Sequence, residues 1–329
     1  MDWNDKTVLV TGAGGFIGSH LVESLINRGA QVRALVRYNA RGDWGNLNFL
    51  PASTKSKLEV LSGDVRDPFF MDRAIEGADT VFHLASLIAI PYSYAAPQSY
   101  VDTNISGTLN VLQGAMRHKT LRVVHTSTSE TYGTALYTPI DEKHPLQGQS
   151  PYSASKIGAD KLAESYYRSF DLPVATIRPF NTFGPRQSAR AVIPTIISQA
   201  LTRDHIELGS LSPVRDLTFV SDTVNGFLHV AQTETCIGEV TNVGNGHGIT
   251  IGELARKILS LMNVELPIRS SDERVRPEKS EVFTLICDNS KARETMGWRP
   301  QVSLEEGLLQ VIEWVRANPS LFRSEEYTV

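Results

Sequence analysis

Short apolar runs alternate with longer segments of mixed polarity along the first half of the chain. The apolar runs are rich in β-branched residues, and we expect strands at 7–12, 31–36, 58–63, 80–85, 121–127 and 173–179. Between them, apolar residues recur at helical spacing in 18–29, 103–117 and 152–170. Strands that are nearly all apolar and are separated by helices indicate a parallel sheet covered on both faces. The pattern therefore predicts an α/β fold with a doubly wound parallel sheet.

The alternation loosens after about residue 180 into loops that contain glycine and proline. Helical periodicity returns at 249–264 and 302–318, and no internal repeat or long linker separates the two halves. We therefore expect a smaller C-terminal α/β domain that is interwoven with the first. The expected larger domain comprises 1–180 with 216–247 returning to it, and the smaller one comprises 181–215 and 248–329.

Composition narrows the class of protein. The chain has 329 residues, a formal net charge of −4, 41% hydrophobic and 21% charged residues, which is typical of a globular protein in water. The slight acidity gives no reason to expect nucleic acid or a membrane as partner. The start of the chain is charged and enters a strand at once, unlike a signal peptide, and no apolar run approaches the ~20 residues of a membrane span. Cys236 and Cys287 follow no metal or redox spacing, so we expect reduced thiols in a cytoplasmic protein.

A glycine motif lies at the first strand–helix junction. "VTGAGGFIGSH" (10–20) places Gly12, Gly15 and Gly18 at GxxGxxG spacing. In a Rossmann fold such glycines allow a tight turn, a close approach of the backbone to a pyrophosphate, and close packing of helix on strand. The helix N-terminus then offers free N–H groups to the phosphates. We therefore predict a dinucleotide site, completed by Phe16, Ile17, Val65, Leu84 and Ala85.

The end of the second strand bears on which dinucleotide is bound. An NAD site usually has an acid there for the ribose 2′-hydroxyl, but "ALVRYNARG" (34–42) has none. Arg37, helped by Arg41, would instead hold a 2′-phosphate, which favours NADP, with NAD as the alternative. The alternative is that both arginines are solvated loop residues that bind no ligand. Asp64, after the third strand, is a candidate contact for the adenine amino group.

Candidate catalytic residues lie in "PYSASK" (151–156). Tyr152 and Lys156 are spaced i and i+4, so they share one helix face. A phenol with a pKa near ~10 is a poor base at neutral pH, and we expect the lysine ammonium and a positive nicotinamide to favour the phenolate. Tyr152 would then remove a proton from a substrate hydroxyl while hydride leaves the same carbon, and Thr128 would hydrogen-bond that hydroxyl.

Five ordered segments, "TGAGGFIGSH", "STSETYG", "PYSASK", "RPFNTFGPRQ" and "VRDLTFVSD", together resemble the extended short-chain dehydrogenase/reductases that modify nucleotide sugars. The resemblance covers essentially the whole chain. It implies that the larger domain binds the dinucleotide, tightly and with recycling, and that the smaller one binds the nucleotide sugar. It also implies a homodimer that forms a four-helix bundle from 103–117 and 152–170.

The resemblance suggests a role for the acid in "HTSTSETYG" (125–133). The family's 4,6-dehydratases carry Thr-X-Glu, matched here by Thr128, Ser129 and Glu130, whereas simple 4-epimerases usually have small residues at the last two positions. A ketone at C4 acidifies the hydrogen on C5, which a carboxylate can remove. Loss of the C6 hydroxyl and return of hydride to C6 then give a 4-keto-6-deoxy sugar. The alternative is that Glu130 is a cap or a salt-bridge partner.

Other reactions remain open. Glucose-type dehydratases place Asp where Ser129 stands, so the acid for the C6 hydroxyl is undecided, with protonated Glu130 as the first candidate. UDP-glucuronate decarboxylases share Thr-Ser-Glu but tend to carry arginine shortly before the catalytic tyrosine, and "HPLQGQSPY" (144–152) has none. A 4-epimerase is a further alternative. A non-catalytic NADP-binding regulator is the alternative from another class. Such proteins often lose the Tyr or the Lys of the catalytic pair, whereas this chain keeps both Tyr152 and Lys156.

The resemblance also implies contacts to the nucleotide sugar, for which arginine is suited because its planar fork binds two phosphate oxygens. The candidates are Asn181, Arg186, Arg190, Arg215, Arg276 and Glu278. "PRQSARAVIPTII" and "LIAIPYSY" look closest to bacterial dehydratases of nucleotide-linked N-acetylglucosamine, on UDP or GDP, that feed nonulosonic acids such as legionaminic acid. We expect His83 to be a packing residue and expect no metal site, because no ligand spacing is present.

Overall fold

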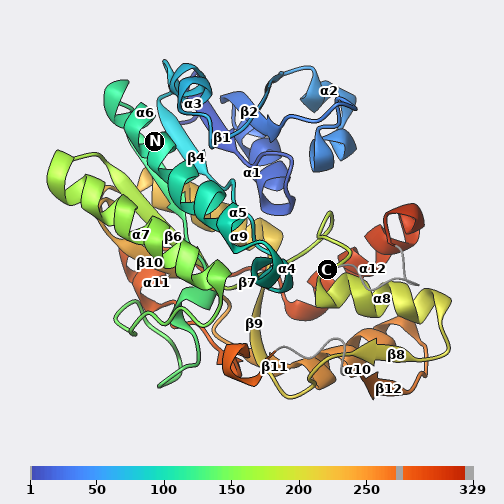
Figure 1. Cartoon of the computed structure of the whole chain (residues 1–329). Coiled ribbons are helices and arrows are strands. Elements are labelled where there is room, and N and C mark those ends of the chain that lie inside the picture. The colour runs from blue at the N-terminus through green and yellow to red at the C-terminus, as the bar shows by residue number, and fades with distance from the viewer. Residues whose placement is uncertain (1, 272–276, 323–329) are drawn as a thin grey trace.

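A seven-stranded parallel sheet forms the centre of the computed structural model, which describes residues 2–271 and 277–322 (Figure 1). The strand order is β10-β6-β5-β4-β1-β2-β3. The strands are β1 Thr7–Thr11, β2 Gln31–Arg37, β3 Leu58–Gly63, β4 Thr80–His83, β5 Arg122–Thr126, β6 Val174–Pro179 and β10 Val240–Val243. The prediction of a doubly wound sheet is confirmed, and the six predicted strands differ from the observed ones by at most two residues at an end.

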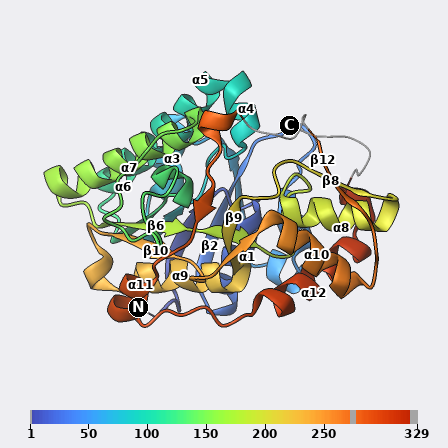
Figure 2. The same cartoon turned by 90° about the horizontal axis from the view of Figure 1, so that it is seen from below.

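Helices cover both faces of this sheet, as the fully buried β4 and β6 require. Figure 2 shows α3 (Pro68–Ile75), α6 (Gly107–Arg117) and α7 (Pro151–Phe170) on one side, and α1 (Phe16–Asn27), α9 (Val220–Gln232) and α11 (Ser290–Met296) on the other. The order of the strands reverses between β1 and β4, so the connections that leave the carboxyl ends of these two strands run in opposite directions. In doubly wound sheets, ligands bind at this topological switch point.

The helix predicted over 103–117 begins differently. A short helix α5 (Pro97–Tyr100) continues into a π-helical turn η2 (Val101–Ser106) before α6 starts. The buried Asn104 lies in that turn, where its amide bonds both backbone groups of Leu87 and the Ser155 hydroxyl of α7. A single π-helical turn is often found at a functional site, and this one ties the segment after β4 to α7.

The second half of the chain forms two smaller sheets. One joins β7 (Asn181–Phe183), β9 (Val214–Phe219), β11 (Gly248–Thr250) and β13 (Thr284–Leu285), and the other pairs β8 (Ile206–Leu208) with β12 (Ile268–Ser270). Around them lie α8 (Val192–Thr202), α10 (Ile251–Met262) and α12 (Leu304–Ala317), which pack on one another (Figure 1). The chain returns to the central sheet at β10, between β9 and β11, and the largest hydrophobic cluster contains residues of both regions, such as Val8 and Ile258.

The remaining helical elements are short. They are α2 Ala52–Lys55, α4 Ile90–Ala95, and the turns η1 Gly45–Phe49, η3 Ser129–Tyr132, η4 Glu234–Cys236, η6 Glu278–Ser280 and η7 Pro319–Leu321. None of the helices in the described ranges has the length and apolar character that would carry it across a bilayer.

Candidate active site

A cavity of about 1070 Å³ lies at the carboxyl ends of the central strands and extends to the second sheet. Pockets for one small ligand are usually ~300–1,000 Å³, so this cavity lies slightly above the upper end of that range. The lining brings together the residues predicted to contact the cofactor, with the exception of Arg41, namely Gly12, Gly15, Phe16, Ile17, Gly18, Arg37, Asp64, Val65, Leu84, Ala85, Tyr152 and Lys156.

The glycine turn has little room for side chains. Gly12 has a left-handed backbone with φ of 69°, and a Cβ on Gly18 would lie 2.2 Å from the Gly12 carbonyl oxygen. Gly15 is the N-cap of α1 and supplies no side-chain cap, so the first N–H groups of the helix are available to a ligand. This local geometry suits a pyrophosphate at the helix N-terminus.

The loop after β2 differs from its prediction. Arg37 is exposed at the cavity, but Arg41 is not among the lining residues, whereas Asp43 is. The Asp43 carboxylate accepts hydrogen bonds from the Gly45 amide at 2.8 Å and the Asn48 side chain at 2.6 Å. The Arg66 guanidinium pairs with Asp64 at 2.6 Å and lowers the pKa of that carboxyl. Asp43 was not predicted, because it lies one residue beyond the segment 34–42 in which an acid was sought.

Tyr152 and Lys156 lie in the first turns of α7, whose start is fixed by a reciprocal capping box between Ser150 and Ser153. Both side chains are buried, at 6% and 4% exposure. The Lys156 ammonium donates to the Thr126 carbonyl oxygen at 2.6 Å, and burial lowers the pKa of Lys156 to about 8. The helix therefore holds its lysine against the end of β5.

The pKa of Tyr152 is shifted in the direction opposite to our expectation. Burial raises it well above the ordinary range of a phenol, the Glu130 charge raises it further, and a hydrogen bond with Thr128 only partly offsets this. The Lys156 ammonium makes its hydrogen bond to the Thr126 carbonyl oxygen. An oxidised nicotinamide bound here would supply the positive charge that favours the phenolate.

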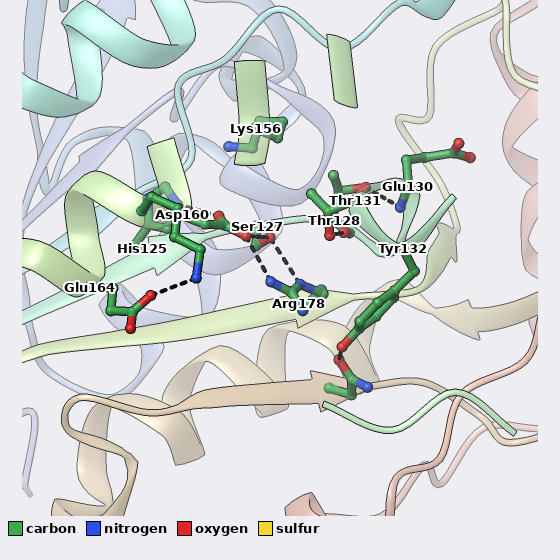
Figure 3. A network of polar contacts seen from close by, with 12 residues as sticks. His125, Ser127, Thr128, Glu130, Thr131, Tyr132, Lys156, Asp160, Glu164 and Arg178 are labelled. Carbon is green, nitrogen blue, oxygen red and sulfur yellow. Dashed lines mark hydrogen bonds and ion pairs between the residues drawn. The ribbon is translucent and has the colours of Figure 1, made fainter. Parts of the chain in front are cut away.

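Glu130 lines the same cavity as Thr128, Ser129 and Tyr152. It lies in η3, where the Thr128 hydroxyl accepts a hydrogen bond from the Glu130 amide at 3.3 Å. Glu130 is half-buried, and within the described part of the chain its carboxylate has no ion pair or hydrogen bond. Figure 3 shows it pointing away from the buried polar side chains behind Thr128. The alternative of a structural cap or salt-bridge partner therefore has no contact to support it.

Several predicted contacts for the nucleotide sugar lie at the far end of the cavity. Asn181 of β7, Arg190 and Arg215 of β9 are lining residues. The Oδ1 atom of Asn181 is buried without a hydrogen-bond partner among the described residues. Arg215 is buried and pairs with Glu281 at 3.2 Å, a lining acid that the sequence analysis overlooked although it lies three residues beyond Glu278.

Of the remaining three candidates, only Arg186 has a described side chain, and it is not among the lining residues. Arg186 is a correction, because its guanidinium pairs with Glu23 of α1 at 2.6 Å and donates to the Ser19 hydroxyl instead. Arg276 lies outside the described residues. Glu278 begins η6, and its side chain also lies outside the description.

His83 occupies a packing position. Its ring bonds the Thr11 hydroxyl at 2.8 Å and the Thr108 hydroxyl at 3.0 Å, and burial holds its pKa well below the usual value. In residues 2–271 and 277–322 no three His, Cys, Asp or Glu side chains gather as metal ligands would.

The combination of a glycine turn at the switch point with a Thr–Tyr–Lys set at the edge of the same sheet defines an extended short-chain dehydrogenase/reductase, and the protein is an enzyme of that class. Residues 9–311 match the family described as GDP-mannose 4,6 dehydratase, and the chain belongs to that family. The resemblance read from the five motifs is thereby confirmed.

Relatives extend along the whole chain. A dTDP-glucose 4,6-dehydratase of an Actinoplanes species is 33% identical and is aligned over 95% of this chain and 98% of its own. The crystal structure of DesIV, a dTDP-glucose 4,6-dehydratase from Streptomyces venezuelae with NAD bound, has a TM-score of 0.89, 31% identity, and coverage of 97% and 100%. A UDP-N-acetylglucosamine 4-epimerase from Methanobrevibacter ruminantium has a TM-score of 0.87, 28% identity, and coverage of 96% and 99%. The relatives thus include both dehydratases and epimerases of nucleotide sugars.

Proposed function

We propose that the protein is a nucleotide-sugar 4,6-dehydratase. The observation that carries the proposal is the Glu130 carboxylate, which lines the same cavity as Thr128 and Tyr152 and has no ion-pair partner among residues 2–271 and 277–322. A 4-epimerase needs only the oxidation and reduction that Tyr152 and Lys156 support. A further carboxylate at the position of Glu130 is required only if a proton has to be removed from a carbon atom of the sugar.

The residues divide the reaction between them. Thr128 orients the C4 hydroxyl, and Tyr152 accepts its proton as C4 is oxidised. A nicotinamide dinucleotide held at the glycine turn would store the hydride from C4 and later supply it to C6. Glu130 then removes the proton from C5, which the C4 ketone has acidified, and returns it to the departing C6 hydroxyl as water forms. As C6 is reduced, C5 takes a proton from solvent and Tyr152 releases the proton that it accepted from the C4 hydroxyl, so the protein groups end as they began. In this scheme Glu130 performs the acid step for which Ser129 lacks a carboxyl group.

The rival reactions have less support. A decarboxylase would need a cation for the substrate carboxylate, and the segment 144–151 before Tyr152 contains no arginine. A regulator without catalysis would not need Tyr152 and Lys156 buried together beside a cavity. A 4-epimerase is the stronger rival, because solved relatives include epimerases.

We further propose an N-acetylhexosamine on UDP or GDP as substrate. The support is the sequence resemblance, together with the apolar segment 88–92, whose residues all line the cavity and offer a surface to an acetamido methyl group. The nucleotide would lie toward Arg190, Arg215 and Asn181. The same proposal favours NADP, on the ground that Arg37 is exposed at the cavity, although solved relatives bind NAD.

The test is to incubate the purified protein with UDP-N-acetylglucosamine, GDP-N-acetylglucosamine or dTDP-glucose, each with NADP or NAD, in deuterium oxide. A product lighter by one water, with deuterium at C5, supports dehydration. A product lighter by one carbon dioxide indicates the decarboxylase, and an unchanged mass with a changed sugar configuration indicates the epimerase. If only dTDP-glucose is converted, the proposed substrate is wrong while the reaction stands.

We also propose a homodimer formed by η2, α6 and α7, in the cytoplasm. These elements expose apolar side chains, namely Val101 at 42%, Leu109 at 37%, Tyr167 at 36% and Phe170 at 55%. The two cysteines are free and buried, which suits a reducing compartment. Light scattering of the protein and of Leu109→Glu checks the dimer: we expect the variant to be a monomer.

A further inference from the structure

A buried polar cluster lies behind the proposed catalytic residues, and the reaction does not use it. Asp160 of α7 accepts hydrogen bonds from Ser127 at 2.6 Å and from Arg178 of β6 at 2.8 Å, and its other oxygen bonds His125 of β5 at 2.9 Å. Arg178 also donates to the Ser127 hydroxyl at 3.1 Å. All four side chains are at most 6% exposed (Figure 3).

The cluster continues beyond these four residues. The Arg178 guanidinium lies 4.6 Å from the ring centre of Tyr132, which ends the η3 turn that carries Glu130. The Tyr132 hydroxyl donates to Asn242 of β10 at 2.7 Å. The cluster therefore joins α7, β5, β6, η3 and β10, which are the elements that converge below the cavity.

Stability alone does not account for such a cluster. Removing two charges from water costs several kcal/mol per ion, so a buried ion pair is often no more stabilising than apolar side chains of the same size. Its effect is to fix geometry, because each partner needs a particular position of the others. Neighbouring positions in this sheet, such as Val124 and Ile177, are apolar and fully buried.

The members of the cluster alternate with the proposed catalytic residues along the chain. Asp160 follows Lys156 by one helical turn, as Lys156 follows Tyr152. His125 and Ser127 flank Thr126, whose carbonyl oxygen holds Lys156, and Thr128 comes next. The Asp160 carboxylate thus bonds His125 and Ser127, which lie on either side of Thr126, and the Thr126 carbonyl oxygen accepts the hydrogen bond from Lys156.

We propose that Asp160 is a positioning residue: by binding His125, Ser127 and Arg178 it fixes the alignment of α7 with the end of β5, so that Tyr152 and Lys156 meet Thr128. This inference rests on the proposed function only through the hydride-transfer step at C4. Every enzymatic alternative considered above shares that step.

The charge of Asp160 has a second consequence. It raises the pKa of Lys156 against the larger lowering by burial. His83 and His125 are the other titratable groups near the ammonium, since the Lys156 charge lowers the pKa of both. In Asp160→Asn the charge that favours protonated Lys156 would be lost, so Lys156 would lose its proton at a lower pH.

The experiment compares Asp160→Asn with Glu164→Gln, which removes the next acid along the same helix, a surface residue paired with Lys161 and Arg168. Hydride transfer is followed as reduction of the nicotinamide on mixing with substrate, across pH. Since a displacement of about 1 Å can slow a reaction by about 10²-fold, we expect Asp160→Asn to slow this step by about that factor, with cofactor affinity retained and the alkaline limb moved to lower pH. Glu164→Gln should behave as the parent.

Two results would overturn the inference. One is an Asp160→Asn protein with the parent's rate and pH profile. The other is a loss of rate in Asp160→Asn that is fully explained by the fraction of unfolded protein, while the alkaline limb of the pH–rate profile stays at the pH of the parent. Asp160→Glu, which keeps the charge, should recover the pH profile even where it does not recover the full rate.

A second measurement does not need turnover. An NMR titration of isotope-labelled lysine, with Lys156→Met to assign the resonance, reports the proton on Lys156 directly. It should titrate at lower pH in Asp160→Asn than in the parent and Glu164→Gln, and an unchanged midpoint would contradict the inference. If dehydration is disproved while hydride transfer and this titration behave as expected, the proposed function fails and the inference stands.

Discussion

The two ends of the cavity are built differently. At the end that holds Thr128, Tyr152 and Lys156, the side chains are fixed by a capping box, by a lysine–carbonyl bond and by buried polar contacts behind them. At the end proposed for the nucleotide sugar, Arg190 and Arg215 come from segments of the second half of the chain, and Arg215 is already paired with an acid, Glu281.

The difference indicates where the protein is arranged in advance and where it must rearrange. Groups that stabilise a transition state work best when they are fixed before the substrate arrives. A diphosphate that binds Arg215 has to compete with Glu281, so part of its binding free energy goes into exchanging partners. Substitutions at the first end should therefore lower kcat, and substitutions at the second should raise KM.

We expect the largest effect from Tyr152→Phe. Loss of the hydroxyl removes the group that accepts the C4 proton, and general acid–base catalysis contributes about 10²- to 10⁴-fold, so kcat should fall toward the upper part of that range. Product formation by mass spectrometry checks it, with cofactor affinity as the control. Parent-like turnover in this variant would disprove the mechanism.

Glu130→Gln should have the next largest effect and should separate two steps. Hydride transfer from C4 should persist, whereas water loss and deuterium exchange at C5 should fall by about 10²- to 10³-fold. Accumulation of reduced nicotinamide without dehydrated product is the expected signal. Equal loss of both steps would mean that Glu130 positions the substrate and is not the C5 base.

The buried lysine should make stability depend on pH. Burial lowers the pKa of Lys156 from 10.5 to about 8, so between these values the unfolded chain binds the proton and the folded chain does not. The free energy of unfolding should therefore rise with pH across this window, by about 1–3 kcal/mol from this group. Urea unfolding at several pH values, compared between the parent and Lys156→Met, checks it, because the variant should lack this contribution.

Arg215→Gln should act at the other end of the cavity and should leave kcat nearly unchanged. A hydrogen bond to a charged group is worth about 1.5–3 kcal/mol, so KM for the nucleotide sugar should rise by roughly 10- to 100-fold. Arg186→Gln is the matched control, because that arginine pairs with Glu23 away from the cavity lining. If KM rose more in Arg186→Gln than in Arg215→Gln, the assignment of Arg215 as the substrate contact would be wrong.

The sequence by itself determined the central sheet and the turns at its edge. Runs of apolar residues define the strands, and the spacing of Tyr152 and Lys156 places them on one face of a helix. The glycine at position 18 is needed because a Cβ there would meet the Gly12 carbonyl oxygen. These features are short-range, since the residues that cause them lie within a few positions of one another. The glycine turn and the Thr–Tyr–Lys set could therefore be found from the sequence, and the structure brings them together at one cavity.

Only the tertiary structure decided which distant charges meet. It pairs Arg186 with Glu23 across 163 residues and Arg215 with Glu281 across 66, and it joins Asp160 to Arg178 behind the cavity. It also decided the direction in which the pKa of Tyr152 shifts, because burial and the Glu130 charge both raise it and the hydrogen bond with Thr128 only partly offsets them. Contacts between distant residues and burial depend on how the whole chain closes, which local spacing does not encode.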